Sequence, residues 1–258
     1  MGTEKRKLAV VIGGGNGIGA ACCRLMAERG WALAVVDLDL ANAQAVAGSL
    51  GGTAFALDVS DYDQVTGLSR EIESALGPVD ALVVSSGTFQ VKGPAEKLEL
   101  ETWRRIFAVN LDGTYFANRT FGTAMAAQGR GSIVNIGSIA GLSGNPLHAY
   151  GPSKAAIINM TKSLAGEWGR SGVRVNCVSP GLTLVPRILE RQRTGGRYAG
   201  NPGDFTALGR GAEPSEVAEG IEFLASDRAS AITGTNLVID CGWEASCGWQ
   251  MYGGVRQD

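Results

Sequence analysis

The sequence predicts an α/β fold in which a seven-stranded parallel sheet is doubly wound, with helices on both of its faces. Short β-branched or apolar runs recur between segments with helical spacing, and this is the order that parallel strands and crossover helices require. Parallel strands are buried on both faces, which is why such runs are apolar rather than alternating. The 258 residues show no linker, low-complexity tract or repeat, so we expect one domain over 1–258.

Seven apolar runs are predicted as strands. They lie at Leu8–Ile12, Leu33–Val36, Ala54–Leu57, Ala81–Val84, Ile133–Ile136, Val173–Val178 and Asn236–Ile239. After the first run, Ile18, Cys22 and Leu25 recur at helical spacing, and Gly30 stands where that helix would end. The chain is therefore expected to begin with a strand, a glycine-rich turn and a helix.

Later helices are marked by residues that favour helix ends. Ser60 with Asp63 resembles a capping box that opens a helix running to Leu76. Pro214 suits the first turn of a helix that runs to about Ser226.

Two segments depart from the regular alternation. Residues 94–128 carry two helical segments, the second long and apolar around Phe107, Leu111 and Phe116. Residues 184–212 are rich in glycine, arginine and loop-forming residues, and we predict that they form a mobile substrate flap.

The composition excludes several classes of function. With 23 basic and 25 acidic residues and a net charge of −2, the chain has no electrostatic footprint for nucleic acid. The apolar stretches are strand-sized and no secretory apolar region follows the first residues, so we expect no membrane contact and a cytoplasmic location. Five cysteines and one histidine lack zinc-ligand spacing, so no metal site is expected.

A glycine-rich turn directly follows the first predicted strand. Its residues Gly13, Asn16, Gly17, Ile18 and Gly19 open the first helix. A glycine can take positive φ and lets backbone N–H groups approach phosphate oxygens, and the helix N-terminus adds roughly half a positive charge. The placement predicts a site for a dinucleotide pyrophosphate, although a plain structural turn would carry the same residues.

Carboxylates end the next two strands. Asp37 could accept hydrogen bonds from both adenosine ribose hydroxyls and would repel a 2′-phosphate, which favours NAD over NADP. A solvated turn carboxylate is the alternative for Asp37. Asp58 and Val59 could contact adenine, and a helix-flanking carboxylate is the alternative for Asp58.

Tyr150 and Lys154 lie one helical turn apart, so their side chains project from the same face of a helix. A phenol with a pKa near 10 is a poor base at neutral pH, but a nearby ammonium could lower that pKa by about 1–3 units. Ser138, after the fifth strand, could donate a hydrogen bond to a substrate oxygen on which charge develops. Asn110 interrupts an apolar helix, where its amide must find partners.

Together these motifs resemble the short-chain dehydrogenase/reductase family, in order and approximate spacing, over essentially the full length. The resemblance implies an extended Rossmann domain, tetrameric or dimeric, in which a nicotinamide cofactor exchanges hydride with a secondary alcohol or ketone. It implies that Tyr150 is the acid/base, that Lys154 lowers its pKa and binds the nicotinamide ribose, that Ser138 orients the substrate oxygen, and that Asn110 holds a water in the proton relay.

The same resemblance implies a set of NAD-binding residues. They are Gly13, Asn16, Gly17, Ile18, Gly19, Asp37, Asp58 and Val59, then Ser86 and Gly87 after the fourth strand, then Tyr150 and Lys154, and finally Pro180, Gly181 and Thr183 beside the nicotinamide carboxamide. Some positions depart from the family pattern: Val185 stands where a hydroxyl is typical, and Val84-Ser85-Ser86-Gly87 replaces a frequent Asn-Asn-Ala-Gly.

The substrate is less well specified by the sequence. Residues 184–212 hold five arginines, Arg187, Arg191, Arg193, Arg197 and Arg210, against Glu190 and Asp204. One interpretation is an anionic substrate, and the other is a solvated helix face with ion pairs. Phe89, Gln90 and Val91 follow the fourth strand and are candidates to line the pocket. The aromatic tail from Trp243 onward is expected to pack on a neighbouring subunit or to cover the pocket.

The favoured function is therefore an NAD-dependent oxidoreductase that interconverts a small secondary alcohol and a ketone, as a homotetramer or homodimer. A 3-oxoacyl-thioester reductase is an alternative within the enzyme class and predicts preference for NADPH. A non-catalytic nucleotide-sensing protein on the same fold is the alternative outside it.

Overall fold

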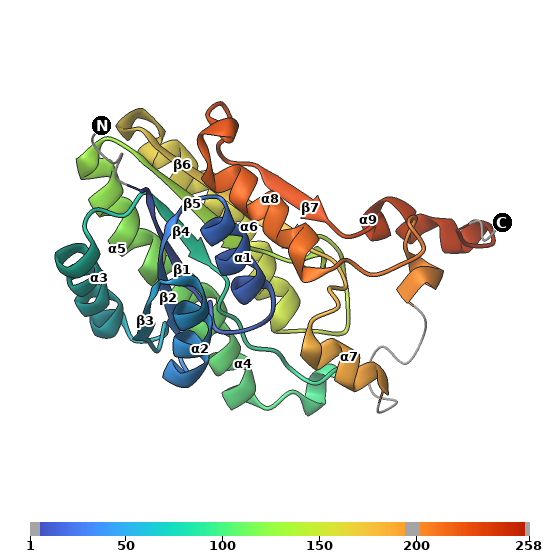
Figure 1. Cartoon of the computed structure of the whole chain (residues 1–258). Helices are drawn as coiled ribbons and strands as arrows, with labels where there is room; N and C mark the ends of the chain where they lie inside the picture. The colour runs from blue at the N-terminus through green and yellow to red at the C-terminus, as the bar shows by residue number, and fades with distance from the viewer. Residues whose placement is uncertain (1–5, 194–201, 256–258) are drawn as a thin grey trace.

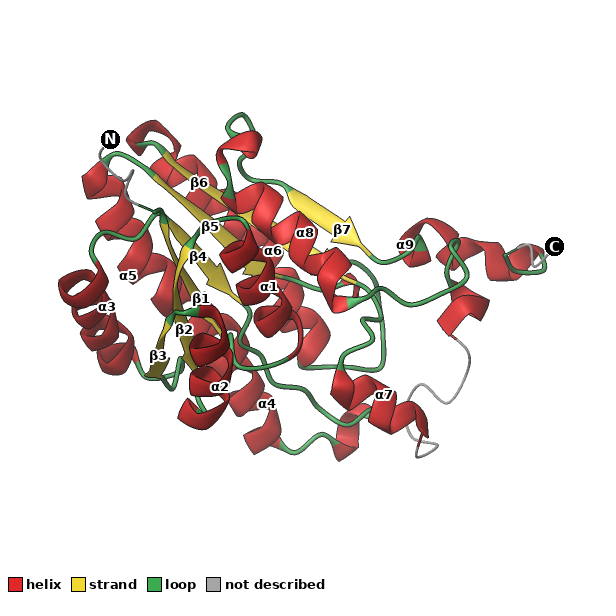
Figure 2. Ribbon diagram, in the orientation of Figure 1, coloured by secondary structure: helices red, strands yellow, loops and turns green. Residues whose placement is uncertain are grey.

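A parallel sheet of seven strands forms the centre of the computed structural model, which describes residues 6–193 and 202–255 (Figure 1, Figure 2). The strands are ordered β3-β2-β1-β4-β5-β6-β7. Their bounds are β1 Leu8–Ile12, β2 Ala32–Asp37, β3 Thr53–Ala56, β4 Ala81–Val84, β5 Gly131–Ile136, β6 Val173–Pro180 and β7 Asn236–Ile239. The predicted fold class is confirmed, and every predicted strand is present within a few residues of its expected bounds.

Helices cover both faces of the sheet. The α-helices are α1 Gly17–Glu28, α2 Leu40–Leu50, α3 Tyr62–Leu76, α4 Leu100–Phe107, α5 Gly113–Gln128, α6 Tyr150–Trp168, α7 Pro186–Arg193, α8 Pro214–Ala225 and α9 Trp243–Ser246. Short 3₁₀ segments are η1 Ala95–Lys97, η3 Ile139–Gly141, η4 Gly169–Ser171, η5 Pro202–Phe205, η6 Asp227–Ala229 and η7 Cys247–Tyr252, and a π-helical turn is η2 Ala108–Asp112.

Two apolar cores separate the helices from the sheet. Alternate residues of β1 belong to different cores: Ala9 and Val11 to one, Val10 and Ile12 to the other. The first core contains residues of α1, α2 and α8, and the second contains residues of α3, α5 and α6. Because successive side chains of a strand point to opposite faces, an uninterrupted apolar run supplies both cores at once.

The helix ends test the sequence predictions. Gly30 has a φ of 86° just beyond α1, and Pro214 is the first residue of α8, both as predicted. The predicted cap at Ser60 is wrong. Asp61 caps α3 by accepting from the N–H groups of Asp63 and Gln64, while the Ser60 hydroxyl donates to Asp58 Oδ1. Asp61 lies one residue closer to the helix, and its carboxylate reaches the free N–H groups of α3, whereas the Ser60 hydroxyl is engaged by Asp58.

The long apolar helix predicted within 94–128 is interrupted by the π-helical turn η2. It joins α4 to α5, and Asn110 lies in it with no exposed surface. π-turns inside helices frequently mark functional sites. Within the described ranges, no helix combines the length and apolarity needed to cross a bilayer.

The predicted flap and the tail lie beyond the sheet. The ends of the flap are joined, because the Leu184 N–H donates to the Ala212 carbonyl at 2.8 Å and the Ala212 N–H to the Leu182 carbonyl at 2.9 Å. The motion of the flap stays a prediction, and residues 194–201 lie outside the described part. Past β7, α9 and η7 project away from the body (Figure 1), with Met251 and Tyr252 almost fully exposed.

Candidate active site

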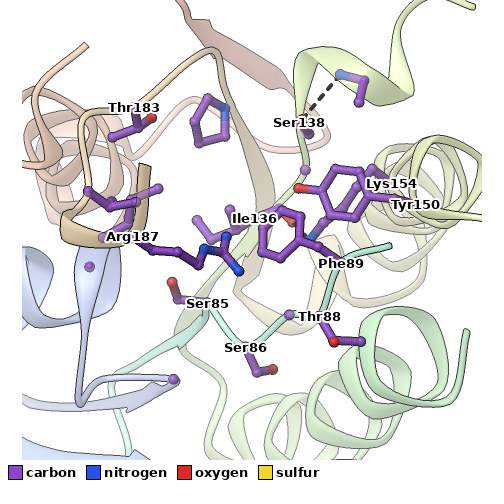
Figure 3. Close-up of a pocket in the computed structure, with 18 of the residues that line it drawn as sticks. Ser85, Ser86, Thr88, Phe89, Ile136, Ser138, Tyr150, Lys154, Thr183 and Arg187 are labelled. Atoms are coloured by element: carbon purple, nitrogen blue, oxygen red, sulfur yellow. Dashed lines mark hydrogen bonds between the residues drawn. The ribbon is translucent and has the colours of Figure 1, made fainter. Parts of the chain in front are cut away.

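A cavity of about 960 Å³ opens at the carboxyl ends of the strands (Figure 3). The strand order reverses at the β1–β4 pair, and Ile12 of β1 and Ser85 after β4 both line the cavity. Open α/β sheets bind ligands at such a switch point. The volume lies at the upper end of the roughly 300–1,000 Å³ typical of ligand pockets, enough for more than one small molecule.

The turn between β1 and α1 requires glycine. Gly13 has a φ of 79°, and a Cβ there would lie 2.6 Å from the Ser86 nitrogen. Gly17 has a φ of 52°. The Gly13 N–H donates to the Val36 carbonyl at 2.8 Å, which ties the turn to β2. The turn therefore packs against both β2 and the loop after β4, and the predicted positive φ is confirmed.

The first turn of α1 presents backbone donors beside the cavity. Its first helical hydrogen bond runs from the Ala20 N–H to the Asn16 carbonyl, so the N–H groups of Ile18 and Gly19 precede the helical ladder. Asn16 and Ile18 line the cavity, whereas Gly19 does not. A Cβ on Gly19 would lie 2.0 Å from the Gly13 carbonyl oxygen, so this glycine lets the turn close onto the helix.

The two predicted acidic residues line the cavity on the β2–β3 side of the sheet. Asp37 Oδ2 accepts from the Gly15 N–H at 2.9 Å, so this carboxylate also holds the glycine turn. Asp58 Oδ1 accepts from the Ser60 N–H at 3.0 Å and from its hydroxyl at 2.6 Å, which is the helix-flanking arrangement. Val59 lines the cavity beside Asp58.

Tyr150 and Lys154 enter the cavity from the first turns of α6, and both are buried. Lys154 Nζ lies 5.7 Å from the centre of the Tyr150 ring and donates to the Ile136 carbonyl at 2.7 Å. Burial lowers the pKa of Lys154 from 10.5 to about 8. The amine therefore lies close enough to influence the phenol, as its spacing in the sequence predicts.

Ser138 lies two residues after β5, at the N-cap of η3, and is almost fully buried at the cavity wall. Its hydroxyl accepts from the Ala140 N–H at 3.1 Å. Asn110 does not line the cavity. Its Oδ1 accepts from the Thr88 N–H at 2.8 Å and its Nδ2 donates to the Thr88 carbonyl at 3.1 Å. The amide thus finds the partners that its burial requires, behind the cavity wall.

The residues present fit a dinucleotide. Between the glycine turn and Tyr150, the Ser86 hydroxyl is buried without a hydrogen-bond partner in the described structure, which favours a polar ligand beside it. Pro180, Gly181 and Thr183 line the cavity after β6. The cavity therefore runs from carboxylates, past backbone donors, to the buried phenol. Within the described ranges, no three His, Cys, Asp or Glu side chains gather in a way that could hold a metal ion.

The arginines of the predicted flap have different surroundings. Arg187 lines the cavity, and its guanidinium carbon lies 4.0 Å from the centre of the Phe89 ring. Arg193 pairs with Glu190 at 2.8 Å and Arg210 with Glu216 at 2.6 Å. Two of the five arginines thus follow the ion-pair interpretation. Arg197 and the side chain of Arg191 lie outside the described residues.

Comparison with known proteins decides the family. A family model described as enoyl-(acyl carrier protein) reductase matches residues 13–244. Galactitol 2-dehydrogenase (L-tagatose-forming) of Cereibacter sphaeroides is 40% identical over 241 residues, which cover 91% of this chain and 94% of that protein. The chain belongs to the short-chain dehydrogenase/reductase family. It is therefore an oxidoreductase of the class that acts on CH–OH groups.

Three further comparisons extend the likeness. D-threitol dehydrogenase of Mycolicibacterium smegmatis is 39% identical over 243 residues, 92% of each protein. A crystal structure described as ribose-5-phosphate isomerase from Brucella melitensis 16M is 44% identical, with a TM-score of 0.94 and 98% of each chain covered. ElxO with NADP bound is 27% identical, with a TM-score of 0.87, over 93% of this chain and 99% of that one.

In this short-chain dehydrogenase/reductase, the cavity gathers all the predicted site residues except Gly19 and Asn110. Of the three residues suggested after β4, Phe89 lines the cavity, whereas Gln90 is buried behind it and Val91 is exposed. Gln90 Oε1 instead accepts from the backbone N–H groups of Ala149 and Tyr150. Sequence reasoning missed this contact, because its partners lie 59 and 60 residues away and only the fold brings them together.

Proposed function

We propose that this oxidoreductase is an NAD-dependent dehydrogenase that oxidises a small secondary alcohol to a ketone, with Tyr150 as the acid/base. The observation that carries the proposal is the pairing of a buried phenol with a buried amine in the same cavity as the glycine turn. A nucleotide-sensing protein would need the turn but not this pair. The pairing therefore favours catalysis.

Each polar group around the phenol has a separate part in the proposed reaction. A bound nicotinamide supplies the hydride acceptor. Tyr150 takes the proton from the substrate hydroxyl as phenolate, and Ser138 donates a hydrogen bond to the same oxygen. Lys154 keeps the phenolate accessible through its positive charge. Asn110 is proposed to support the proton relay from behind the cavity wall, where it also holds Thr88.

The preference for NAD is proposed from Asp37. A carboxylate and a phosphate about 4 Å apart repel by about 4 kcal/mol per pair of unit charges at an effective dielectric constant of 20. Replacing Asp37 by Ser is expected to raise kcat/KM for NADP by about 10- to 100-fold and to lower it for NAD. Steady-state kinetics with both cofactors measure this. Asp39→Asn, at the N-cap of α2, is the control. An unchanged cofactor ratio in the Asp37 variant would contradict the proposed preference.

The substrate is proposed to be a polyol or a sugar-like alcohol. A second form of this proposal adds an anionic group to the substrate. The named relatives galactitol and threitol dehydrogenase support the polyol. Arg187 supports the anionic group, because it is a cation at the cavity wall beside Phe89, which stacks on Tyr150. A charge-assisted hydrogen bond from this guanidinium would bind a carboxylate or phosphate more strongly than a hydroxyl.

A matched pair of substrates tests the anionic interpretation. Arg187→Gln is expected to raise KM for a sugar acid by about 10-fold or more while leaving KM for the corresponding polyol unchanged, because a hydrogen bond to a charged group contributes about 1.5–3 kcal/mol. Arg193→Gln, which removes only a surface ion pair, is the control. An equal rise in KM for both substrates, or a rise in KM for NAD, would mean that Arg187 does not recognise an anionic group of the substrate.

The experiment that tests the function as a whole is a substrate panel. NADH formation is followed with polyols, sugars, hydroxy acids, steroids and cyclic diols, and the reverse reaction with a 3-oxoacyl thioester and NADPH. Ribose 5-phosphate is assayed without cofactor, since an isomerase would turn it over and a dehydrogenase would not. Tight NAD binding with no turnover of any substrate would favour the nucleotide-sensing alternative.

Assembly and location complete the proposal. We propose a homotetramer or homodimer, because Trp249, Met251 and Tyr252 expose large apolar surface on a projecting tail. Sedimentation measures the assembly directly. We also propose a cytoplasmic location, with the five cysteines as free thiols, the state that a reducing compartment maintains.

A further inference from the structure

The segment Thr88–Gln90 after β4 is fixed at both of its ends. At one end, both backbone polar groups of Thr88 bond to the side-chain amide of Asn110, at 2.8 and 3.1 Å. At the other end, Gln90 Oε1 accepts from the Ala149 N–H at 2.7 Å and the Tyr150 N–H at 3.0 Å. The segment therefore spans from the π-helical turn to the start of the helix that carries the phenol.

A second set of bonds closes this path into a ring. Asn110 Nδ2 also donates to Ser153 Oγ at 3.2 Å, and the Ser153 hydroxyl donates to the Tyr150 carbonyl at 2.8 Å. Asn110 and Ser153 have no exposed surface, and Gln90 is 4% exposed. Water therefore competes little for the bonds of these three side chains, and hydrogen bonds linked in this way strengthen one another.

Gln90 takes the place of a local helix cap. The N-cap position of α6 is occupied by Ala149, whose side chain cannot accept a hydrogen bond. The free N–H groups at a helix start need acceptors, and here a buried glutamine from a distant loop supplies one for two of them. One of these N–H groups belongs to Tyr150 itself, so the Gln90 oxygen fixes the backbone from which the phenol projects.

Phe89, the residue before Gln90, contacts the aromatic ring of the same tyrosine. Phe89 stacks on Tyr150 with 4.6 Å between ring centres and 25° between their planes. Figure 3 shows Phe89 between the Tyr150 ring and Arg187. Two consecutive residues thus hold the backbone and the ring of Tyr150.

We propose that Gln90 is a positioning residue for the acid/base: its amide oxygen caps α6 and holds Tyr150 at the place where proton transfer occurs. This inference rests on the proposed function of Tyr150. Gln90 does not line the cavity, so its loss is expected to lower kcat and to leave KM for NAD unchanged. A displacement of about 1 Å at a reacting group costs up to 100-fold in rate.

Three substitutions of Gln90 distinguish the effect of losing its hydrogen bonds from the effect of losing its side-chain volume. Gln90→Glu keeps an acceptor oxygen at the same reach, Gln90→Met keeps the volume without an acceptor, and Gln90→Asn keeps the amide but shortens its reach. The Glu variant is expected to keep kcat within about 3-fold of the unmodified chain. The Met and Asn variants are expected to lose about 10- to 100-fold in kcat, with KM for NAD within 2-fold. If the Met variant does not fold, the Asn variant carries the comparison.

Control variants distinguish the possible failures. Asp61→Ala removes the two equivalent cap bonds of α3, so it destabilises a helix without lowering kcat. The proposal is overturned if the folded Met or Asn variant keeps the full kcat, or if the Glu variant loses as much as Met. Tyr150→Phe is assayed in parallel. If Tyr150→Phe stays active, the proposed function fails; if it is inactive while Gln90→Met is fully active, only the positioning role fails.

Discussion

Replacing Tyr150 by Phe is expected to lower kcat by about 10²- to 10⁴-fold, the range that a positioned acid or base contributes. The change removes one hydroxyl and keeps the ring, so the stack on Phe89 at 4.6 Å is retained. Because the glycine turn, Asp37 and the residues after β6 are untouched, binding of NAD is expected to change far less than kcat. Steady-state kinetics, together with NAD binding measured by calorimetry, separate the loss of proton transfer from a loss of structure.

A second tyrosine provides the matched control. Tyr115 on α5 is 41% exposed and lies outside the cavity, so Tyr115→Phe is expected to keep full activity. Substantial turnover by the Tyr150 variant would mean that another group moves the proton. Ser138 is the candidate for that group, because it lines the same cavity. The double variant of Tyr150 and Ser138 would then be the next measurement.

The fold was predictable because its signal is local and repeated. Each buried strand is an apolar run, and Gly30 and Pro214 mark helix ends through their own backbone geometry. The cap of α3 was misplaced by one residue, because Ser60 and Asp61 both have capping side chains and only the structure shows that Asp58 engages Ser60. Local competition of this kind limits what a sequence pattern can specify.

The site was predictable where its chemistry depends on spacing and not predictable where it depends on packing. Tyr150 and Lys154 are neighbours on one helix, so their proximity follows from helical periodicity. Gln90 and Asn110 instead make hydrogen bonds to segments far away in the chain. The interruption of the long helix at Asn110 has the same origin, because its amide bonds to Thr88 of another loop.

Replacing Lys154 by Met is expected to stabilise the protein at pH 7 while lowering its turnover. Burial holds the pKa of Lys154 at about 8, below its value of 10.5 when exposed, which corresponds to a cost of about 3 kcal/mol for the buried ammonium. Met has a similar length and no charge. The substitution also removes the donor to the Ile136 carbonyl, at a cost of about 1–3 kcal/mol. The balance is a net gain of up to about 2 kcal/mol at pH 7.

The stability gained by the Lys154→Met variant should decrease as the pH rises. Between pH 8 and 10.5 the unfolded chain binds more protons at Lys154 than the folded one, so the stability of the unmodified protein rises with pH in this window. The Met variant lacks that contribution. Its advantage should shrink by roughly 2 kcal/mol between pH 7 and pH 9.5. Urea unfolding of both proteins at the two pH values measures the change, and a difference independent of pH would contradict the burial argument.

At neutral pH, the turnover of the Lys154→Met variant should fall although its stability rises. Without the ammonium, the phenolate loses the nearby positive charge that stabilises it, so less phenolate is expected at pH 7. The rate of the Met variant should then rise with pH well beyond the point at which the unmodified enzyme levels off. Lys162 is exposed on the same helix and provides the control. Lys162→Met is expected to change neither the difference in stability between pH 7 and pH 9.5 nor the dependence of the rate on pH. These results together would mean that Lys154 destabilises the fold at the pH where it is proposed to support catalysis, which is the relation expected of a charge buried for its chemistry rather than for structure.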